Sequence, residues 1–228
     1  MATHLDLEEQ EQLDQLKAFW KQYGNLITWV LVIALGGYAA WMGWNNWTRE
    51  QTAKAGVLYE EMEKAVQAGD AEKSARVFND LKERYGSTGY TQQAALLNAK
   101  LQHEKGQADA ARAALAWAGD NASEDEYRTV ARLRLAGLLL DEKKYDEALK
   151  QLEGVKSAEF AGLVADRRGD ILLAQDKKDD AKAAYLEAWK ALADAGDYRR
   201  IVEAKLASLG AAPAAETPKT SPVSGASQ

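Results

Sequence analysis

Two carboxylates in the C-terminal half have the spacing expected of a chemical site. Asp166 and Asp170 are four residues apart, which places both on one face of a helix. Such a pair could act as paired catalytic carboxylates or hold a cation. Arg167 and Arg168 lie beside them, so an ion-pair network that ties this helix to a neighbour explains all four charges more simply. We therefore predict a structural network here.

Other residue types that carry chemistry are scarce. The chain has no cysteine, which excludes disulfides, thiolate zinc sites, iron–sulfur clusters and cysteine nucleophiles. Its two histidines are His4 and His103, and His103 is predicted to lie on the surface near a helix end. No Gly-rich phosphate loop, HExxH motif or nucleophile elbow is present. We predict that the protein is not an enzyme, with no catalytic residues, no cofactor and no metal site.

The overall charge argues against nucleic acid as a partner. The 228 residues include 29 Lys and Arg against 35 Asp and Glu, a net charge of -6. Affinity for DNA or RNA backbones depends on basic residues that displace counterions from phosphates. A chain with this balance has no basic field of that kind.

The charges are absent from one stretch, residues 22–48, which contains 27 consecutive uncharged residues. Leu26–Trp47 would form a helix of about 33 Å, against about 30 Å of bilayer hydrocarbon. Aromatic residues near both ends resemble the belt found at membrane interfaces. We predict one membrane-spanning helix whose interfacial anchors are Trp29, Trp41, Trp44 and Trp47.

The span is predicted to remain as an anchor. A cleaved signal peptide has a positive N-terminal region and a shorter apolar core, whereas residues 1–21 carry five acids and two bases. Gly36, Gly37 and Gly43 either admit a neighbouring helix or face lipid, and the sequence does not decide between these. Basic residues flank the span almost equally, so the positive-inside rule leaves the orientation open.

After the span, the pattern of residues 49–209 is helical, without a convincing strand and without proline before Pro213. Strong helix formers from Arg49 to Ala68 predict that the membrane helix continues into this region. Turn signals then divide it into about eight short helices in antiparallel pairs. The predicted breaks lie at Gly69-Asp70, Gly86-Ser87, Gly106, Gly119-Asp120, Lys143, Gly154 to Ser157, Asp176 and Gly196-Asp197.

Three blocks of 17 residues repeat without gaps, beginning at Ala99, Ala136 and Gly169, with spacings of 37 and 33. Each block has this small residue on a first helix, a charged turn, and an alanine on a second helix. Small residues at both places permit two helices to cross closely, which is typical of a tetratricopeptide-type repeat rather than a generic bundle. The second-helix alanines are Ala111, Ala148 and Ala181, and Ala75 with Phe78 is predicted to mark an earlier, degenerate unit.

Solenoids of this type bind partner segments on a concave face formed by the first helices. The residues predicted to line that face are Val130, Leu133, Leu140, Leu163, Asp166 and Leu173. Alternatively, these leucines belong to the core of each hairpin. The predicted fold is all-α: one N-terminal transmembrane helix followed by a tetratricopeptide-like helical-hairpin solenoid.

Several segments together resemble the YfgM family, an ancillary subunit of the SecYEG translocon. They are the GWNNW exit of the span, Arg132–Glu153, and Leu163–Tyr185 with its motif VADRRGD. The similarity covers about residues 8–209.

The resemblance implies a bacterial inner-membrane protein with a cytoplasmic N-terminus and a periplasmic repeat domain. It also implies association with SecYEG, with a membrane-anchored periplasmic chaperone such as PpiD, and a role in export of secreted and outer-membrane proteins. Inner-membrane lipid and unfolded clients complete the expected partners. The expected divisions are residues 1–21, 22–48, 49–209 and an Ala/Pro/Ser-rich tail, 210–228, predicted to be disordered. The alternative function is a membrane-anchored scaffold or regulator of another envelope complex or stress response.

Overall fold

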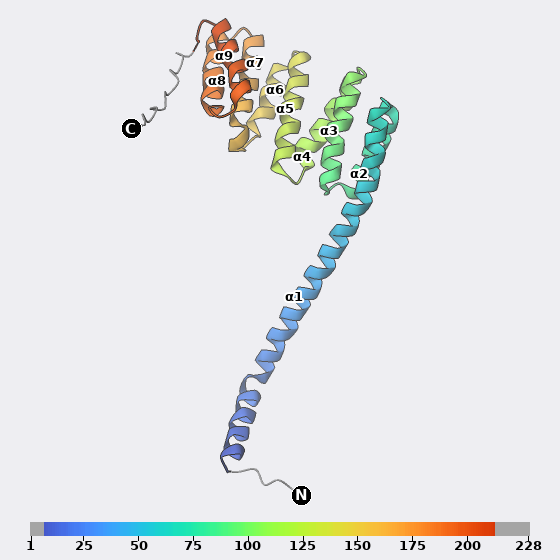
Figure 1. Cartoon of the computed structure of the whole chain (residues 1–228), viewed down its shortest axis with the longest axis vertical. Coiled ribbons are helices and arrows are strands. Elements are labelled where there is room, and N and C mark those ends of the chain that lie inside the picture. Colours follow the sequence, from blue (N-terminus) through green and yellow to red (C-terminus); the bar gives the residue numbers. More distant parts are fainter. Residues whose placement is uncertain (1–6, 213–228) are drawn as a thin grey trace, which may run out of the picture. The chain divides into compact units, whose positions relative to one another are not determined.

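The computed structural model describes residues 7–212, and these fold into helices joined by short turns, without a β-strand within that range (Figure 1). The all-α prediction is therefore confirmed. The elements are α1 (Leu7–Gln67), α2 (Ala71–Tyr85), α3 (Gly89–Glu104), α4 (Ala108–Asn121), α5 (Asp125–Asp141), α6 (Tyr145–Glu153), the 3-10 helix η1 (Ala158–Phe160), α7 (Ala161–Ala174), α8 (Lys178–Ala191) and α9 (Gly196–Ser208). The predicted tail beyond residue 212 lies outside the described residues.

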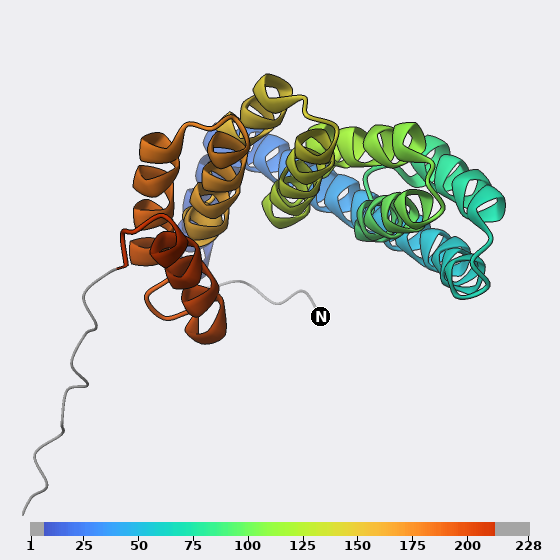
Figure 2. The same cartoon turned by 90° about the horizontal axis from the view of Figure 1, so that it is seen from above.

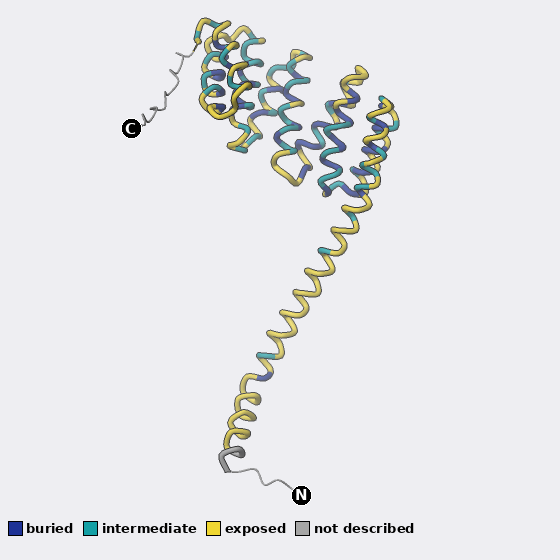
Figure 3. Tube along the Cα trace, viewed as in Figure 1, coloured by how far each residue is buried: buried dark blue, intermediate teal, exposed yellow. Residues whose placement is uncertain are grey.

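The chain divides into two compact units, residues 1–54 and 55–228, and α1 contributes to both. In the first unit, α1 is long and apolar enough to cross a membrane. The large apolar side chains of the predicted span are exposed, except that of Ile27, which is half-buried (Figure 3). A core helix of a soluble domain would bury such residues against other protein, so the exposure supports a membrane anchor.

The second unit is a stack of helical hairpins whose turns share one geometry. Gly69, Gly106, Lys143 and Asp176 all have a left-handed backbone, with φ between 61° and 75°. In each turn, the amide after the left-handed residue donates to a carbonyl five residues back, as Gln107 N does to Gln102 O at 2.8 Å. This is the usual way to end a helix with αL geometry. The turns define four hairpins, α1–α2, α3–α4, α5–α6 and α7–α8 (Figure 2).

The predicted small residues lie where the two helices of each hairpin cross. Ala136 and Ala148 in the third hairpin are both 0% exposed, as are Ala111 and Ala181. Gly169 is buried under the ring of Tyr185, and a Cβ atom at Gly169 would lie 2.4 Å from Tyr185 Cε1. Because an added methyl group has no room here, the crossing distance depends on glycine.

One predicted position is wrong by a single residue. The small residue of the first hairpin is Ser74, which is 0% exposed and lies 37 residues before Ala111, whereas Ala75 is only half-buried. The Ser74 hydroxyl donates to Asn98 Oδ1 at 2.9 Å and lies 3.2 Å from Met62 Sδ. Met62 in turn lies 37 residues before Ala99. The last turns of α1 are therefore the first helix of the first hairpin.

One predicted helix end is also displaced. Gly119 and Asp120 lie inside the last turn of α4, which continues to Asn121. Ala122 then has an extended backbone, and the chain turns there. Glycine suits position 119 because the side chain of Arg132 packs against its Cα. A Cβ atom there would lie only 3.2 Å from Arg132 Cγ.

Helix α9 is the last element of the stack within residues 7–212. It ends at Ser208, and Gly210 then has a φ of 70°, which repeats the turn geometry of the hairpins. Seven residues before that turn, α9 carries Glu203, whereas α3 and α5 carry Ala, α7 carries Gly and α1 carries Met. A charged residue at the crossing position is suited to a terminal helix that faces solvent, as the end of a solenoid requires. Val202 and Leu206, both 0% exposed, pack the other face of α9 into the core.

Replacing the crossing glycine tests this packing. We expect Gly169→Ala to destabilise the repeat domain by about 1–3 kcal/mol, because the methyl group overlaps the Tyr185 ring. The control is Gly137→Ala in α5, where the nearest atom is 3.7 Å away, and this change should stabilise by roughly 0.5–1 kcal/mol through helix propensity. Urea unfolding of the full chain in detergent, followed by circular dichroism, measures both. Equal effects of the two substitutions would contradict the crossing geometry.

Candidate partner-binding site

A hollow of about 340 Å³ is lined by the first helices of three consecutive hairpins, α3, α5 and α7, and by Leu115 of α4. Its floor is made of small and apolar residues, and its walls are mostly charged. The floor consists of Ala99, Leu115, Gly137 and Leu138, and the walls of Lys100, His103, Arg134, Asp141 and Arg167. Because first helices form the concave side of such a solenoid, we call this hollow the groove.

The groove is basic, although the domain that contains it is acidic. Its walls include three Lys or Arg residues and one carboxylate, that of Asp141. Arg134 is exposed and has no ion-pair partner within residues 11–212. Lys100 pairs with Glu104 at 3.8 Å, and both side chains are more than half exposed. Exposed pairs contribute little, so these cations can turn to an incoming carboxylate at little cost.

The residues predicted for the concave face lie elsewhere. Val130 is half-buried, Leu133 and Leu140 pack against the larger core, and Leu163 and Leu173 pack against the smaller core around α8 and α9. None of these five lines the groove. Their role as hairpin core, the alternative drawn from the sequence, accounts for these contacts.

The groove residues that the prediction missed lie one position later. Arg134 follows Leu133, Asp141 follows Leu140, and Arg167 follows Asp166. Successive side chains are about 100° apart around a helix. A shift of one position therefore moves a side chain from the hairpin interior to the open face. A signal was available, because Arg134 and Arg167 are 33 residues apart and occupy the same position of two repeats.

Asp166 is buried, so it does not lie on an open face as predicted. Its side chain is 4% exposed, and its two oxygens accept hydrogen bonds from Lys205 Nζ and the Tyr198 hydroxyl, both at 2.7 Å. Lys205 also donates to Asp170 Oδ1 at 2.7 Å, and the Tyr185 hydroxyl donates to the same oxygen at 2.8 Å. This cluster fastens α9 to α7 and α8.

The structural network predicted from the four charges is therefore present, with an additional partner. Arg167 approaches Asp170 at 3.6 Å, and Arg168 donates to Glu187 of α8 at 3.2 Å. The central cation is Lys205, which lies 39 residues after Asp166 in the sequence. No pattern in the sequence near Asp166 predicted the contact with Lys205.

The cluster changes the titration of its two tyrosines. Burial, and then the hydrogen bond to Asp170, raise the pKa of Tyr185 above its usual value, and burial with the bond to Asp166 does the same for the pKa of Tyr198. The folded state thus favours the protonated hydroxyls. Their contribution to stability is fully present below about pH 10 and is lost as the pH rises beyond it.

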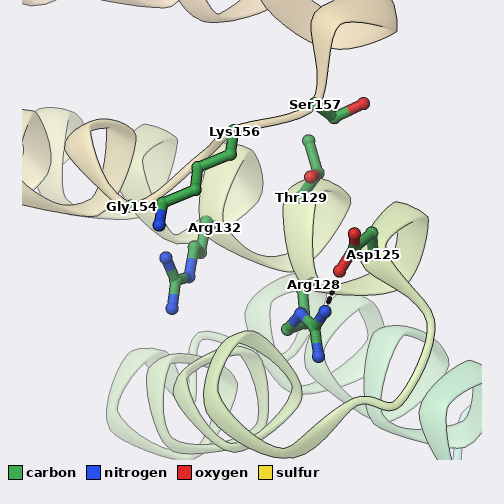
Figure 4. A pocket seen from close by; sticks show the side chains of 7 residues that line it. All are labelled: Asp125, Arg128, Thr129, Arg132, Gly154, Lys156 and Ser157. Atoms are coloured by element: carbon green, nitrogen blue, oxygen red, sulfur yellow. Dashed lines mark ion pairs between the residues drawn. The ribbon is translucent and has the colours of Figure 1, made fainter.

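A second basic hollow, of about 320 Å³, opens where α6 ends. Helix α6 has nine residues, against 14 in α4 and in α8, so its missing turn leaves space beside the first turns of α5. Figure 4 shows the Lys156 ammonium beside the Arg132 guanidinium, with Arg128 and Asp125 across the hollow. Gly154 lies against Arg132, where a Cβ atom would overlap the guanidinium. The remaining lining residues are Thr129 and Ser157.

Both hollows can attract carboxylates, and neither has the features of a catalytic or metal centre. Residues 11–212 contain no group of three or more His, Asp or Glu side chains placed to hold a metal ion.

The predicted interfacial tryptophans Trp29, Trp41, Trp44 and Trp47 are 50–68% exposed on α1, as lipid-facing rings would be.

These features define a helical-repeat protein of the tetratricopeptide type with an N-terminal helix that can span a membrane. The family model for the tetratricopeptide repeat-like domain matches residues 17–211. A protein of Neisseria gonorrhoeae is 31% identical over 92% of this chain and all of its own length. Relatives from Haemophilus influenzae (30% identity, 80% of this chain and 89% of the relative) and Escherichia coli (28%, 78% and 85%) are also similar.

All three relatives carry the name ancillary SecYEG translocon subunit. The chain belongs to the tetratricopeptide repeat-like family and, within it, to the YfgM family. The resemblance drawn from the sequence is confirmed.

Removing the central cation tests the cluster on α7. We expect Lys205→Met to destabilise the domain by about 3 kcal/mol, because it leaves the buried Asp166 carboxylate without its cation. Adding Asp166→Asn should recover part of that loss, since the two residues are coupled. Lys178→Met is the control, because the pair of Lys178 with Asp176 is exposed and should contribute less than about 0.5 kcal/mol. Urea unfolding measures all four proteins, and equal effects of the two lysine substitutions would contradict the account.

Proposed function

We propose that this chain is a non-enzymatic ancillary subunit of the SecYEG translocon, held in the bacterial inner membrane by a single helix. The observation that carries the proposal is the full-length match to the Neisseria gonorrhoeae relative, which bears that name. The match includes both the apolar part of α1 and the repeat domain, so the two parts that the function needs occur together. The corresponding divisions are residues 1–21, 22–48, 49–209 and 210–228.

The repeat domain, in this proposal, binds a membrane-anchored periplasmic chaperone of the PpiD kind. The support is the groove, whose basic walls and apolar floor suit an acidic segment with some apolar side chains. The second basic hollow adjoins the same helix, α5, and can receive a further carboxylate. Binding of this kind assists the transfer of secreted and outer-membrane proteins, including unfolded clients.

Membrane anchoring makes weak contacts sufficient. Two proteins confined to one membrane meet at a high effective concentration, so a groove with a few exposed charge pairs can still hold a partner. The repeat domain must then lie on the same side of the membrane as its partner. A periplasmic chaperone requires a periplasmic repeat domain and therefore a cytoplasmic N-terminus.

A second function remains compatible with the same surfaces. A membrane-anchored scaffold or regulator of another envelope complex or stress response would use the same groove with a different partner.

Crosslinking in native membranes identifies the partner. We expect the full chain to crosslink to the SecYEG channel and to a periplasmic chaperone, identified by mass spectrometry. Arg134→Glu should reduce the chaperone crosslink several-fold, because it reverses a charge on the groove wall. Arg76→Glu, an equally exposed change on α2 outside the groove, serves as the control and should leave it unchanged. Recovery of signalling or envelope-assembly proteins alone would favour the second function.

Protease accessibility tests the proposed orientation. Protease added outside spheroplasts should degrade the repeat domain and spare residues 1–21, which carry an N-terminal tag for detection. Lysed spheroplasts provide the control in which both parts are cleaved. Protection of the repeat domain in intact spheroplasts would reverse the orientation.

A further inference from the structure

The apolar face of α1 begins well before the uncharged stretch. Leu13, Leu16, Trp20 and Tyr23 are 40–63% exposed and follow one another at spacings of three and four residues. These spacings place them on one face of the helix, with Phe19 at its edge. Charged residues occupy the opposite face: Glu11, Asp14, Lys17 and Lys21. Residues 11–23 thus form an amphipathic helix that leads directly into the span.

This amphipathic segment is too far from the exit of the span to lie in the hydrocarbon as well. From Leu13 to Trp47 is 35 residues, or about 52 Å of helix, against about 30 Å of hydrocarbon. Even at a tilt of about 40°, the hydrocarbon accommodates only about 26 helical residues. The uncharged stretch, residues 22–48, already has that length. Residues 11–23 must therefore lie outside the hydrocarbon.

The junction between the two segments is suited to a change of direction. Gly24 is covered by the indole of Trp20, and a Cβ atom there would lie 3.1 Å from Trp20 Nε1. Thr28 Oγ1 donates to the Gly24 carbonyl at 2.8 Å. A hydroxyl that bonds to a carbonyl of the preceding turn favours helix bending, and glycine lowers the resistance to it.

We propose that residues 11–23 form an interfacial helix, which lies in the headgroup layer with Leu13, Leu16 and Trp20 directed into the lipid. The lipid surface is the occupant because the segment is continuous with the span and is held at the membrane by it. Two acids and two bases give residues 11–23 no net charge, and Lys17 pairs with Asp14 at 3.2 Å. Binding thus depends on apolar burial, and anionic lipid contributes little. The proposal rests on the insertion of the span and is independent of the translocon.

The absence of cysteine from the chain permits a direct test by single-cysteine spin labelling. The full chain is reconstituted into vesicles of phosphatidylcholine, and separately into phosphatidylcholine with phosphatidylglycerol. Leu16→Cys and Leu13→Cys report the apolar face, and Ala18→Cys reports the charged face. Ala34→Cys reports the middle of the span. For each label, accessibility to oxygen, which dissolves in lipid, is compared with accessibility to a water-soluble nickel complex.

We expect an oxygen-to-nickel ratio several-fold higher at residues 13 and 16 than at residue 18, in both lipid mixtures. Equal ratios on the two faces would overturn the interfacial helix, whether both are exposed to water or both to lipid. A label at residue 34 that is accessible to nickel would overturn the span itself. If the labels at residues 13 and 16 are exposed to water in vesicles but protected in native membranes, a protein partner covers the apolar face. That result would overturn the proposal.

Discussion

The repeat domain depends on one spatial constraint, the close crossing of two helices in each hairpin. The crossing residue on the first helix lies seven positions before a turn residue with a left-handed backbone, as Ala99 does before Gly106 and Gly169 before Asp176. Where the constraint holds, hairpins form and stack. At α9 the same position carries Glu203, and within residues 7–212 no second helix follows. In α3, α5 and α7, a small residue at this position thus lets the second helix cross closely.

The constraint also explains how the anchor and the repeat domain are joined. Met62 of α1 occupies the crossing position of the first hairpin, opposite Ser74. The helix that enters the membrane is therefore also the first helix of the solenoid, and the two share a continuous backbone. Buried Ser74 then bonds to Asn98 of the second hairpin, so the anchored hairpin is linked to the next by a polar contact as well as by packing.

Much of this organisation could be predicted from the sequence, because it depends on local patterns. The uncharged stretch, the helix breaks near Gly106 and Lys143 and the crossing alanines all follow from composition and spacing. The Asp166–Lys205 contact could not be predicted, since its partners are 39 residues apart and belong to different helices. The residues that line the groove were not predicted, for another reason. The prediction took leucines as binding residues. In the structure these leucines pack in the hairpin core, and Arg134 and Arg167 lie on the open side.

A membrane-anchored solenoid that is a subunit of the SecYEG translocon must lie close to the channel in the same bilayer. The most direct measurement is energy transfer between a fluorophore on the purified full chain and one on purified SecYEG, in the same lipid nanodisc. We expect efficient transfer that unlabelled chain reduces by competition. Transfer no greater than that from an unrelated single-pass membrane protein at the same density would contradict it.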